Sequence, residues 1–395
     1  MNFPSTALRA RRVLDRLKRG VPPAEGIDDL AVGMEHLEAR LLDLLKREAG
    51  PRWLAIQSEY GEGKSHFHTF ARQRALSAGF AVTSLDINKD EGALHYPQRH
   101  INVLLECLRS PLDRFAHLQG IGGMVRAWLE IAPTSEVQSL LRHCLALIPE
   151  LPAGRDPGLF RTWVSAVLAS DKEPIARRRH QANLANYFTG EDLMHRSPMA
   201  RFAAGYRLQL VERWLVGVGH HGLLLFVDEV DNIVRQIHTR GHSGCFRTLG
   251  WYCASPALAA TRVVFASTPE ILEQFNNGGG KHYLHSIQSQ ATVPLAEARA
   301  FGRWLGEVHS EAKAGWVSCP RLSAPQRLEL FSRIAALYMT AWGRADTPTH
   351  RQLDELARHP QFSTTRRWVR AAVHVIECLT QAKSSNIENQ VRVSN

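Results

Sequence analysis

The sequence lacks the marks of disulfide-rich, membrane-spanning and disordered proteins. Its six cysteines are scattered and form no CxxC pair, so no disulfide framework is indicated. No apolar run reaches the roughly 18 residues that cross a bilayer, and the first residues lack the apolar stretch of a secretory signal. Apolar residues make up 44% of the 395 positions, enough for one large or two moderate cores. We therefore expect a globular, cytoplasmic protein without a membrane segment.

Acidic residues are fewer than basic residues. The chain has 48 Lys and Arg against 38 Asp and Glu, a net charge of +10, and an isoelectric point near 9.6. This excess suits a phosphate-rich partner such as double-stranded DNA, although the two signs are interleaved along the chain. The densest basic cluster has aromatic neighbours, and it is compatible both with nucleic-acid contact and with an ordinary solvated helix face. It comprises Lys172, Arg177, Arg178, Arg179 and His180, flanked by Trp163, Tyr187 and Phe188.

One stretch organises the rest of the chain. The apolar residues Trp53–Ile56 are followed by a glycine-containing loop and then by helix-forming residues, which predicts a strand, a phosphate loop and a helix. The glycines let backbone N–H groups turn toward phosphate oxygens, Lys64 can reach the β- and γ-phosphates, and the hydroxyl of Ser65 can bind Mg²⁺. We expect the nucleotide to be held by Ser58, Glu59, Tyr60, Gly61, Glu62, Gly63, Lys64, Ser65 and His66.

The loop departs from the pattern GxxxxGK[ST] at one position. Ser58 stands where the pattern has its first glycine, and a side chain is less comfortable than glycine in the turn that this residue usually occupies. The loop alone therefore leaves an ordinary glycine-rich turn open as an alternative, and a second nucleotide signal is needed.

That second signal lies far downstream. The unbroken apolar run Leu223–Val227 ends in two carboxylates, Asp228 and Glu229, and is typical of a buried parallel strand. At the carboxyl end of such a strand, Asp228 would hold Mg²⁺ through water and Glu229 would orient the attacking water, as phosphoryl transfer from ATP requires. The two signals together are far more specific than either one.

The remaining pattern predicts an α/β core with helical additions. Residues 80–87 and 262–266 read as further strands, and residues 291–295 as the last strand, whereas 276–280 has the composition of a flexible loop. We expect a parallel sheet flanked by helices, with a long helical insertion and a C-terminal helical lid. The expected domains are a helical leader over 1–50, a core over 51–300 with the insertion at about 112–200, a lid over 301–383, and a flexible tail over 384–395.

This order of features is similar to that of the AAA+ ATPases of the initiator-like kind. The closer resemblance is to the BREX bacteriophage-defence ATPases of the BrxD type. It covers the leader, the core and the lid but not the interval 112–200. The residues that carry it are Arg19–Pro22, Ser58–Phe67, Val227–Glu229 and Ala266–Glu270.

The resemblance implies roles for individual residues. Lys64, Ser65, Asp228 and Glu229 keep the roles described above. Two sensor positions are added to these. Thr268, or alternatively Ser267, would take the first sensor position at the end of a strand, and Arg366 would take the second at the start of the last lid helix, with Arg367 as a competitor.

One expected residue type is missing. AAA+ proteins usually carry an arginine that reaches into a neighbouring subunit's site, but no arginine lies between Arg262 and Arg299. Either Lys281 serves this purpose, or an arginine from elsewhere such as Arg247 does, or ATP turnover does not depend on a neighbour. Because an arginine finger contributes a factor on the order of 10³–10⁵ to hydrolysis, its absence favours a slow ATPase.

By this resemblance the chain is an ATP- and Mg²⁺-dependent ATPase of a phage-defence complex, with double-stranded DNA and other defence proteins as partners and nucleotide-switched assembly on DNA. Homo-oligomer formation is left open. Two alternatives are a nucleotide-gated scaffold and a DNA-binding regulator, each with negligible hydrolysis. Glu229 argues against the regulator with a vestigial site, because such a site has no need of a positioned base.

Overall fold

The computed structural model describes residues 5–46, 48, 50–90, 92–146, 160–162, 164–165, 174–189, 198–290, 293–310, 315–319, 321–343 and 362–393. The chain divides into two compact units. The first comprises Met1–Leu42, Ile56–Gln73 and Val317–Asn395, and the second comprises Asp43–Ala55 and Arg74–Trp316.

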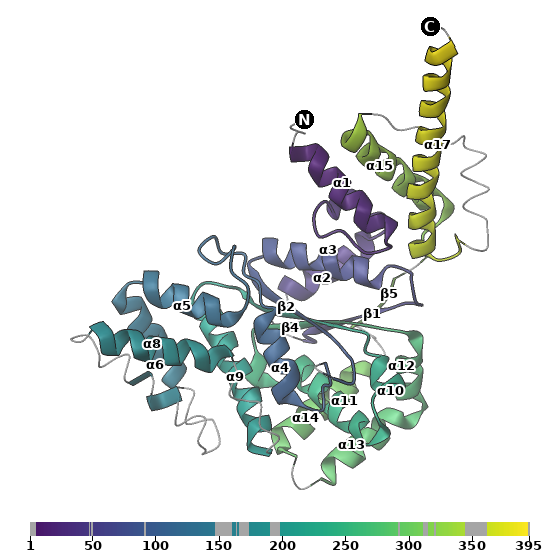
Figure 1. The fold of residues 1–395 in the computed structure, drawn as a ribbon. Helices are drawn as coiled ribbons and strands as arrows, with labels where there is room; N and C mark the ends of the chain where they lie inside the picture. The colour runs from purple at the N-terminus through teal and green to yellow at the C-terminus, as the bar shows by residue number, and fades with distance from the viewer. Residues whose placement is uncertain are drawn as a thin grey trace. The chain divides into compact units, whose positions relative to one another are not determined.

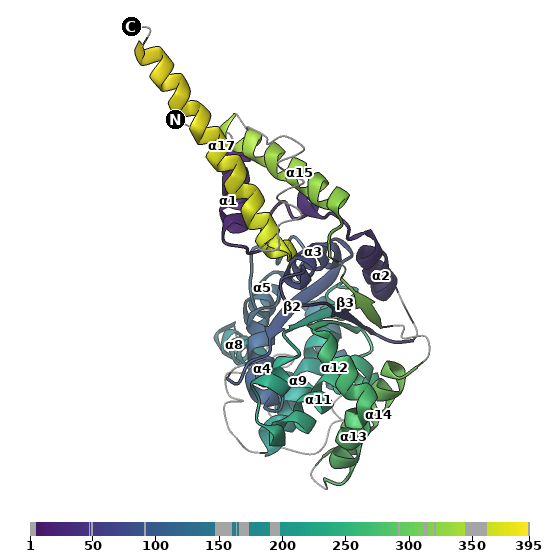
Figure 2. The same cartoon turned by 90° about the vertical axis from the view of Figure 1, so that its right-hand side faces the viewer.

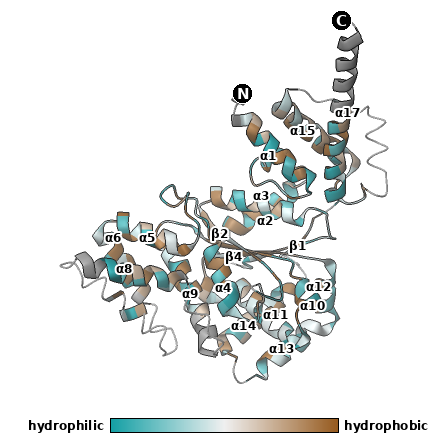
Figure 3. Ribbon diagram, in the orientation of Figure 1, coloured by the Kyte–Doolittle hydropathy of each residue, from teal (hydrophilic) through white to brown (hydrophobic). Residues whose placement is uncertain are grey.

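Five strands form one sheet in the order β2-β3-β4-β1-β5, and helices flank it (Figure 1). The strands are β1 (Trp53–Gln57), β2 (Phe80–Asp86), β3 (Gly222–Asp228), β4 (Thr261–Ser267) and β5 (Trp316–Ser318). Strands β2, β3 and β4 pair in parallel, and Figure 3 shows the strands as mostly hydrophobic. Because parallel strands need crossover connections, a helix or helices lie between successive strands. The expected α/β class with a parallel sheet is confirmed.

The expected last strand at 291–295 is wrong for its described part. Leu295 begins α14 (Leu295–Val308), and Pro294 is its N-cap residue, while Ala291 and Thr292 lie outside the described residues. Proline has no N–H to give to a sheet ladder and is well suited to a helix start. The fifth strand is β5 instead.

In the second unit, three helices lie on the same face of the sheet (Figure 2). They are α4 (Pro97–Glu106), α9 (Pro198–Gly217) and α11 (Thr239–Ala254), which contact β2, β3 and β4 respectively. The core between sheet and helices is rich in aromatic rings, with Trp53 stacked on Phe265 and edge-on to Trp304. This apolar packing fixes the ends of the strands, where polar side chains emerge.

The interval 112–200 contains the helices α5 (Ile121–Ile131), α6 (Thr134–Ala146) and α8 (Pro174–Thr189) among its described residues. Arg178 and Arg179 on α8 are exposed. Tyr187 and Phe188, however, are 1% exposed and lie in the core, so they are not available to stack on bases. The prediction that Tyr187 and Phe188 flank an exposed basic cluster is therefore wrong. Lys172 and Trp163 lie outside the described residues.

The expected flexible loop at 276–280 is also wrong. Beyond α10 (Asn232–Arg235), η4 (Pro256–Leu258) and α12 (Pro269–Gln274), the chain forms the π-helical turn η5 (Phe275–Gly279) and then α13 (Gly280–Gln288). Gly278 has a φ of 92°, and this left-handed conformation, which glycine adopts without strain, absorbs the kink between the two helices.

The first unit is built from helices at both ends of the chain. They include α1 (Ser5–Lys18), η1 (Asp28–Leu30), α15 (Ala324–Trp342) and α17 (Thr365–Val393). Helices α2 (Glu35–Lys46) and α3 (Lys64–Ser77) each contribute their first part to this unit. Leu14, Ile334 and Trp368, from α1, α15 and α17, are buried in one core. Leader and lid helices therefore form one body, and α17 continues as a helix well past residue 383, where the sequence suggested a lid boundary.

The basic side chains of α1 are largely used within this unit. Arg11 donates to the carbonyl of Ala341 at 3.0 Å, and Lys18 forms an ion pair with Glu377 at 2.7 Å. Arg16 donates to the carbonyl of Pro22 at 2.8 Å. These contacts explain part of the positive charge of the chain without a nucleic-acid partner. None of the described helices combines the length and the hydropathy that a bilayer crossing requires.

Candidate functional site

The phosphate loop connects β1 to α3 and is shaped by two glycines. Gly61 and Gly63 have φ angles of 86° and 114°, a region that residues with a Cβ rarely adopt. Ser58 is buried, and it is not among the described residues with a positive φ. A serine at this position therefore carries no left-handed backbone strain, so the departure from the glycine pattern is compatible with a phosphate loop.

Lys64 already lies over the loop that it is expected to serve. Its Nζ donates to the carbonyl oxygens of Ser58 at 2.6 Å and Glu59 at 3.1 Å. Ser65 is exposed in the first turn of α3, where the backbone N–H groups of a helix attract anions. The glycine cradle, the cation and the helix N-terminus are together a suitable set of groups for binding phosphate.

His66 and Tyr60 differ in their surroundings. Burial lowers the pKa of His66 to about 4, against a weaker opposite effect of its backbone hydrogen bond with Leu30, so the ring is neutral at pH 7. Its Nε2 is buried without a hydrogen-bond partner. Tyr60 is 72% exposed, and its hydroxyl accepts a hydrogen bond from Nη1 of Arg366 at 3.1 Å.

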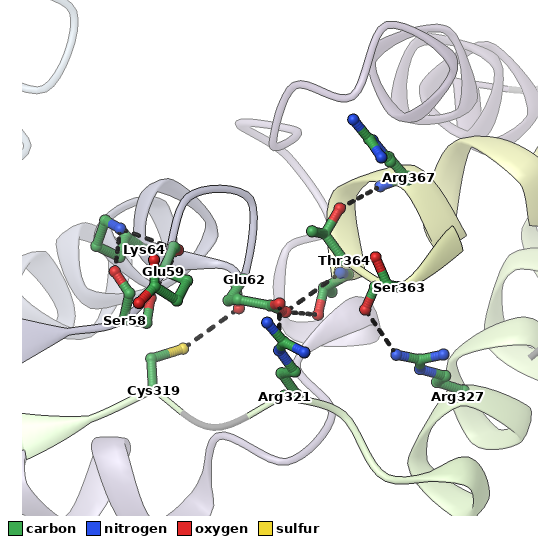
Figure 4. A network of polar contacts seen from close by, with 11 residues as sticks. Ser58, Glu59, Glu62, Lys64, Cys319, Arg321, Arg327, Ser363, Thr364 and Arg367 are labelled. Atoms are coloured by element: carbon green, nitrogen blue, oxygen red, sulfur yellow. Dashed lines mark hydrogen bonds and ion pairs between the residues drawn. The ribbon is translucent and has the colours of Figure 1, made fainter. Parts of the chain in front are cut away.

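Glu62 is used differently from what the loop pattern suggests. Its side chain is buried and forms an ion pair with Nε of Arg321 at 2.8 Å. The other carboxylate oxygen accepts hydrogen bonds from the backbone N and the hydroxyl of Thr365, at 3.3 and 3.1 Å. Figure 4 shows this network. The carboxylate is thus directed to Arg321 and the start of α17, and a negative group is in any case unsuited to contact phosphate.

Of the two arginines that compete for the second sensor position, Arg366 contacts the phosphate loop. Its backbone N donates to the carbonyl of Gly61 at 2.9 Å, in addition to its side-chain bond to Tyr60. The side chain of Arg367 is exposed, and its backbone N donates to the hydroxyl of Thr364 at 3.4 Å. The structure thus favours Arg366 over Arg367 as the arginine associated with the loop.

In the second unit, Asp228 and Glu229 stand at the carboxyl end of β3. In the register of the parallel strands β2 and β3, Asp228 lies opposite Asp86. The carboxylate of Asp228 accepts a hydrogen bond from the backbone N of Glu229 at 2.8 Å. Glu229 has a φ of 56°, the one positive φ of a residue other than glycine among those described. A left-handed conformation at such a residue is costly and is concentrated at functional sites.

Asn232 holds the Glu229 side chain. Its amide nitrogen donates to Oε2 of Glu229 at 2.6 Å and to the carbonyl of Ile87 at 2.9 Å, so the carboxylate is oriented from the next turn of the chain. Asn232 and Asp86 were not among the residues predicted from the sequence. The signal for Asp86 was its place as the last polar residue of a predicted strand, while Asn232, three residues after Glu229, carried no recognisable motif.

The surroundings of Glu229 raise the pKa of its carboxyl group. Glu229 is exposed overall, but partial burial of its carboxyl group raises the pKa most strongly, and the negative charges of Asp228, Asp86 and Asp231 raise it further, against the opposing hydrogen bond from Asn232. A carboxylate with a raised pKa is a better proton acceptor near neutral pH than an ordinary one. The arrangement therefore suits a base that takes a proton from water.

The expected first sensor lies at the end of the neighbouring strand β4. The backbone N of Val230 donates to the carbonyl of Ala266 at 3.0 Å, which joins the segment after Glu229 to this strand end. The hydroxyls of Ser267 and Thr268 are both buried without a hydrogen-bond partner. Unpaired buried hydroxyls are costly in a finished core, so they indicate groups that a ligand or water satisfies. The structure does not separate Thr268 from Ser267.

The two candidate fingers have opposite environments. Arg247 on α11 is 2% exposed and forms an ion pair with Glu297 at 3.0 Å, so it is a core residue and cannot reach a neighbouring subunit. Lys281 is exposed in the first turn of α13. The alternative that Arg247 acts as the finger is therefore wrong, and the other two alternatives remain.

The expected Mg²⁺ ligands fit that ion in type. Ser65 offers a hydroxyl and Asp228 a carboxylate, and Mg²⁺ bound with a nucleotide usually takes few protein ligands because phosphates and waters supply the others. Within the described ranges, no group of three or more His, Cys, Asp or Glu side chains is arranged to hold a metal ion. A site made by the protein alone is thus not seen among these residues.

Part of the chain matches the model of a known protein family. Residues 6–131 match the family model of the BREX system ATP-binding protein BrxC/D. This chain resembles the BREX ATP-binding proteins. The match confirms the resemblance expected from the sequence, although it does not separate BrxC from BrxD. No curated protein and no solved structure gives a match.

The BREX match covers some of the candidate site and leaves out the rest. It contains the leader, the phosphate loop and β2, and it extends through α5. It therefore enters the interval 112–200, which the sequence analysis placed outside the resemblance. It ends before Asp228, Glu229, Thr268 and Arg366. The case for these four residues rests on the structure and on the motifs.

Proposed function

We propose that this protein is an ATP-binding and ATP-hydrolysing component of a BREX-type phage-defence complex. The phosphate loop supports ATP binding, because two left-handed glycines and the ammonium group of Lys64 are what a triphosphate requires. The BREX match over the same residues supports the same ligand.

The observation that carries hydrolysis is the left-handed backbone of Glu229. A protein that only bound ATP would have no reason to keep a glutamate in a conformation that glycine adopts without strain. Asn232 holds Oε2 of this carboxylate, which leaves Oε1 to accept a proton from water. We assign the orientation of the attacking water to Glu229, and to Thr268 and Arg366 contacts with charge that develops in the reaction.

Ser65 and Asp228 would hold Mg²⁺, which when bound neutralises phosphate charge and orients the triphosphate. The remaining work is done by the protein's own groups. Lys64 would exchange the carbonyl oxygens of Ser58 and Glu59 for phosphate oxygens. A phosphate is the stronger partner because a hydrogen bond between a charged ammonium group and a charged phosphate is stronger than one to a neutral carbonyl.

Binding is tested first. The wild-type protein and Lys64→Ala are titrated with a fluorescent, slowly hydrolysed ATP analogue in Mg²⁺, and anisotropy is measured. We expect saturable binding by the wild type and at least a 100-fold loss of affinity in Lys64→Ala. Equal affinity in the two proteins would refute the assignment of the phosphate loop.

A nucleotide-gated scaffold with very slow hydrolysis is the second candidate. The burial of Arg247 favours it, because this arginine is not available to accelerate hydrolysis in a neighbour. Phosphate release measured over a 50-fold range of protein concentration separates the cases. We expect low turnover per subunit that changes little with concentration, whereas a steep rise that is lost in Lys281→Ala would show that subunits complete each other's sites.

Double-stranded DNA and other defence proteins are the proposed partners. The exposed Arg178 and Arg179 on α8 and the net charge of +10 support contact with phosphates. Such contact predicts binding that weakens steeply with salt and is insensitive to DNA sequence. Titration of two unrelated duplexes at several salt concentrations measures both properties, and a flat salt response would contradict the proposal.

A further inference from the structure

The N-terminus of α17 is bonded to the phosphate loop. The first N–H groups of a helix have no partner inside the helix and need one outside. The N–H of Thr365 is satisfied by the carboxylate of Glu62 at 3.3 Å, and that of Arg366 by the carbonyl of Gly61 at 2.9 Å. The loop that is expected to bind phosphate therefore also caps a helix that begins about 300 residues later, at a separation of 303 positions between Glu62 and Thr365.

The carboxylate of Glu62 has a partner on each oxygen: Oε1 has an ion pair but no hydrogen bond, and Oε2 accepts two hydrogen bonds. Glu62 is 4% exposed, and Arg321 supplies the ion pair while Thr365 supplies both hydrogen bonds. A negative group is favourable at a helix N-terminus, and hydrogen bonds to a charged acceptor are stronger than neutral ones. These bonds join the side chain of a loop residue directly to the first residue of α17.

Close packing supports the same connection. A Cβ on Gly61 would lie 3.3 Å from the hydroxyl of Thr364, and a Cβ on Gly20 would lie 2.9 Å from Nε of Arg366. The side chain of Arg366 thus runs beside Gly20 of the leader toward Tyr60. Farther along α17, Nε of Arg370 donates to the carbonyl of Lys18 at 3.2 Å. A path of direct contacts leads from the phosphate loop through α17 to α1.

We propose that Glu62 is a positioning residue that couples the phosphate loop to the helical body made of α1, α15 and α17. It holds Arg366 beside the loop, and a change of the loop on nucleotide binding moves the start of α17. Lys64 holds the carbonyls of Ser58 and Glu59, so a phosphate that draws Lys64 away changes the backbone next to Glu62. This second step rests on the proposed ATP binding, but the capping of α17 does not.

Hydrogen–deuterium exchange of the full chain tests the capping without nucleotide. The readout is exchange in peptides that cover residues 363–370. We expect Glu62→Gln to raise exchange there about tenfold, because the isosteric amide weakens the bonds to Thr365 and the pairing with Arg321. Thr365→Val, which removes the hydroxyl donor, should raise it about threefold, and Thr365→Ser, which keeps the donor, should restore the wild-type rate. Thr340→Val on α15 is the matched control, since its hydroxyl donates to the carbonyl of Ala336 in the same helix.

The second arm adds a slowly hydrolysed ATP analogue with Mg²⁺. In the wild type we expect the exchange of residues 363–370 to change on binding. In Glu62→Gln this change should be lost, while affinity for the analogue stays within about threefold of the wild type. If Glu62→Gln instead loses affinity as Lys64→Ala does and leaves exchange unchanged, then Glu62 contacts the nucleotide and the proposal is overturned.

The two arms fail separately. Wild-type exchange in nucleotide-free Glu62→Gln, with an unchanged melting temperature, would overturn the capping whatever the protein binds. Absence of any ATP binding by the wild type would refute the proposed function and the coupling, and the nucleotide-free comparison would still decide whether Glu62 caps α17.

Discussion

The left-handed conformation of Glu229 makes an unusual prediction about stability. At most positions a glycine destabilises a protein relative to alanine, because glycine loses more conformational freedom on folding. With a φ of 56° at residue 229, the order should be reversed. We expect Glu229→Gly to be more stable than Glu229→Ala, although both variants lack the carboxylate and should lose turnover alike.

The magnitude follows from two opposing terms. A left-handed backbone costs a residue with a Cβ about 1–2 kcal/mol, and the extra freedom of glycine in the unfolded chain costs about 0.4–1 kcal/mol. Loss of the bond from Asn232 is common to both variants and cancels. The free energy of unfolding should therefore be about 1 kcal/mol higher for the glycine variant, and with a denaturant slope of about 3 kcal/mol per M its midpoint should be about 0.3 M higher in urea.

Urea unfolding followed by circular dichroism measures this difference, and Gly306 supplies a control in the same unit. Gly306 lies within α14, and a Cβ there would meet no atom within 4 Å. Gly306→Ala should therefore raise the midpoint, the opposite order to residue 229. If Glu229→Ala were as stable as Glu229→Gly or more so, the strained backbone, and with it the argument for a catalytic Glu229, would be refuted.

Three further predictions test other parts of the site. Asp86→Asn removes a negative charge that raises the pKa of Glu229. The acid limb of the pH–rate profile for kcat should therefore move to lower pH, and an unmoved limb would contradict the assignment of the base. Gly63→Ala should weaken ATP binding at least tenfold in the anisotropy titration, and unchanged affinity would contradict this. The φ angle of residue 63 is 114° and the nearest atom to the new Cβ is 3.7 Å away, so the loss of affinity comes from the strained backbone and not from a clash. Arg247→Met should lower the free energy of unfolding by about 3 kcal/mol through loss of the buried ion pair with Glu297. Turnover per folded subunit should be retained, and lost turnover in a stable protein would show that Arg247 acts in catalysis.

The sequence allowed the parallel α/β core and its candidate residues to be predicted because these depend on local patterns. An apolar run that ends in two carboxylates is readable as a buried strand with acidic residues at its tip, and β3 (Gly222–Asp228) contains this run and ends at the first carboxylate. Misassigned segments were those where local composition was ambiguous. Thr292 and Val293 suggested a strand, yet Pro294 is the N-cap of a helix that begins at Leu295. The glycines of 278–280 suggested a loop, yet Gly278 bends a helical segment.

The contacts that hold the site residues in place could not be predicted, because they join residues distant in the chain. Glu62 looks like one more loop residue between two glycines, and its role depends on Thr365, which lies 303 positions away. Asp86 comes beside Asp228 only through the pairing of β2 with β3. The burial of Arg247 is likewise set by the helices around α11 and not by its neighbours in sequence.

Phosphate release from Glu229→Gln at saturating ATP and Mg²⁺ decides whether this BREX-like protein hydrolyses ATP with Glu229 as the group that orients water. The isosteric amide keeps the shape of the side chain but cannot accept the proton of water. We expect unchanged affinity for ATP and a fall in kcat of at least about 100-fold, within the range that general bases contribute. A variant that binds and hydrolyses ATP at the wild-type rate would contradict it.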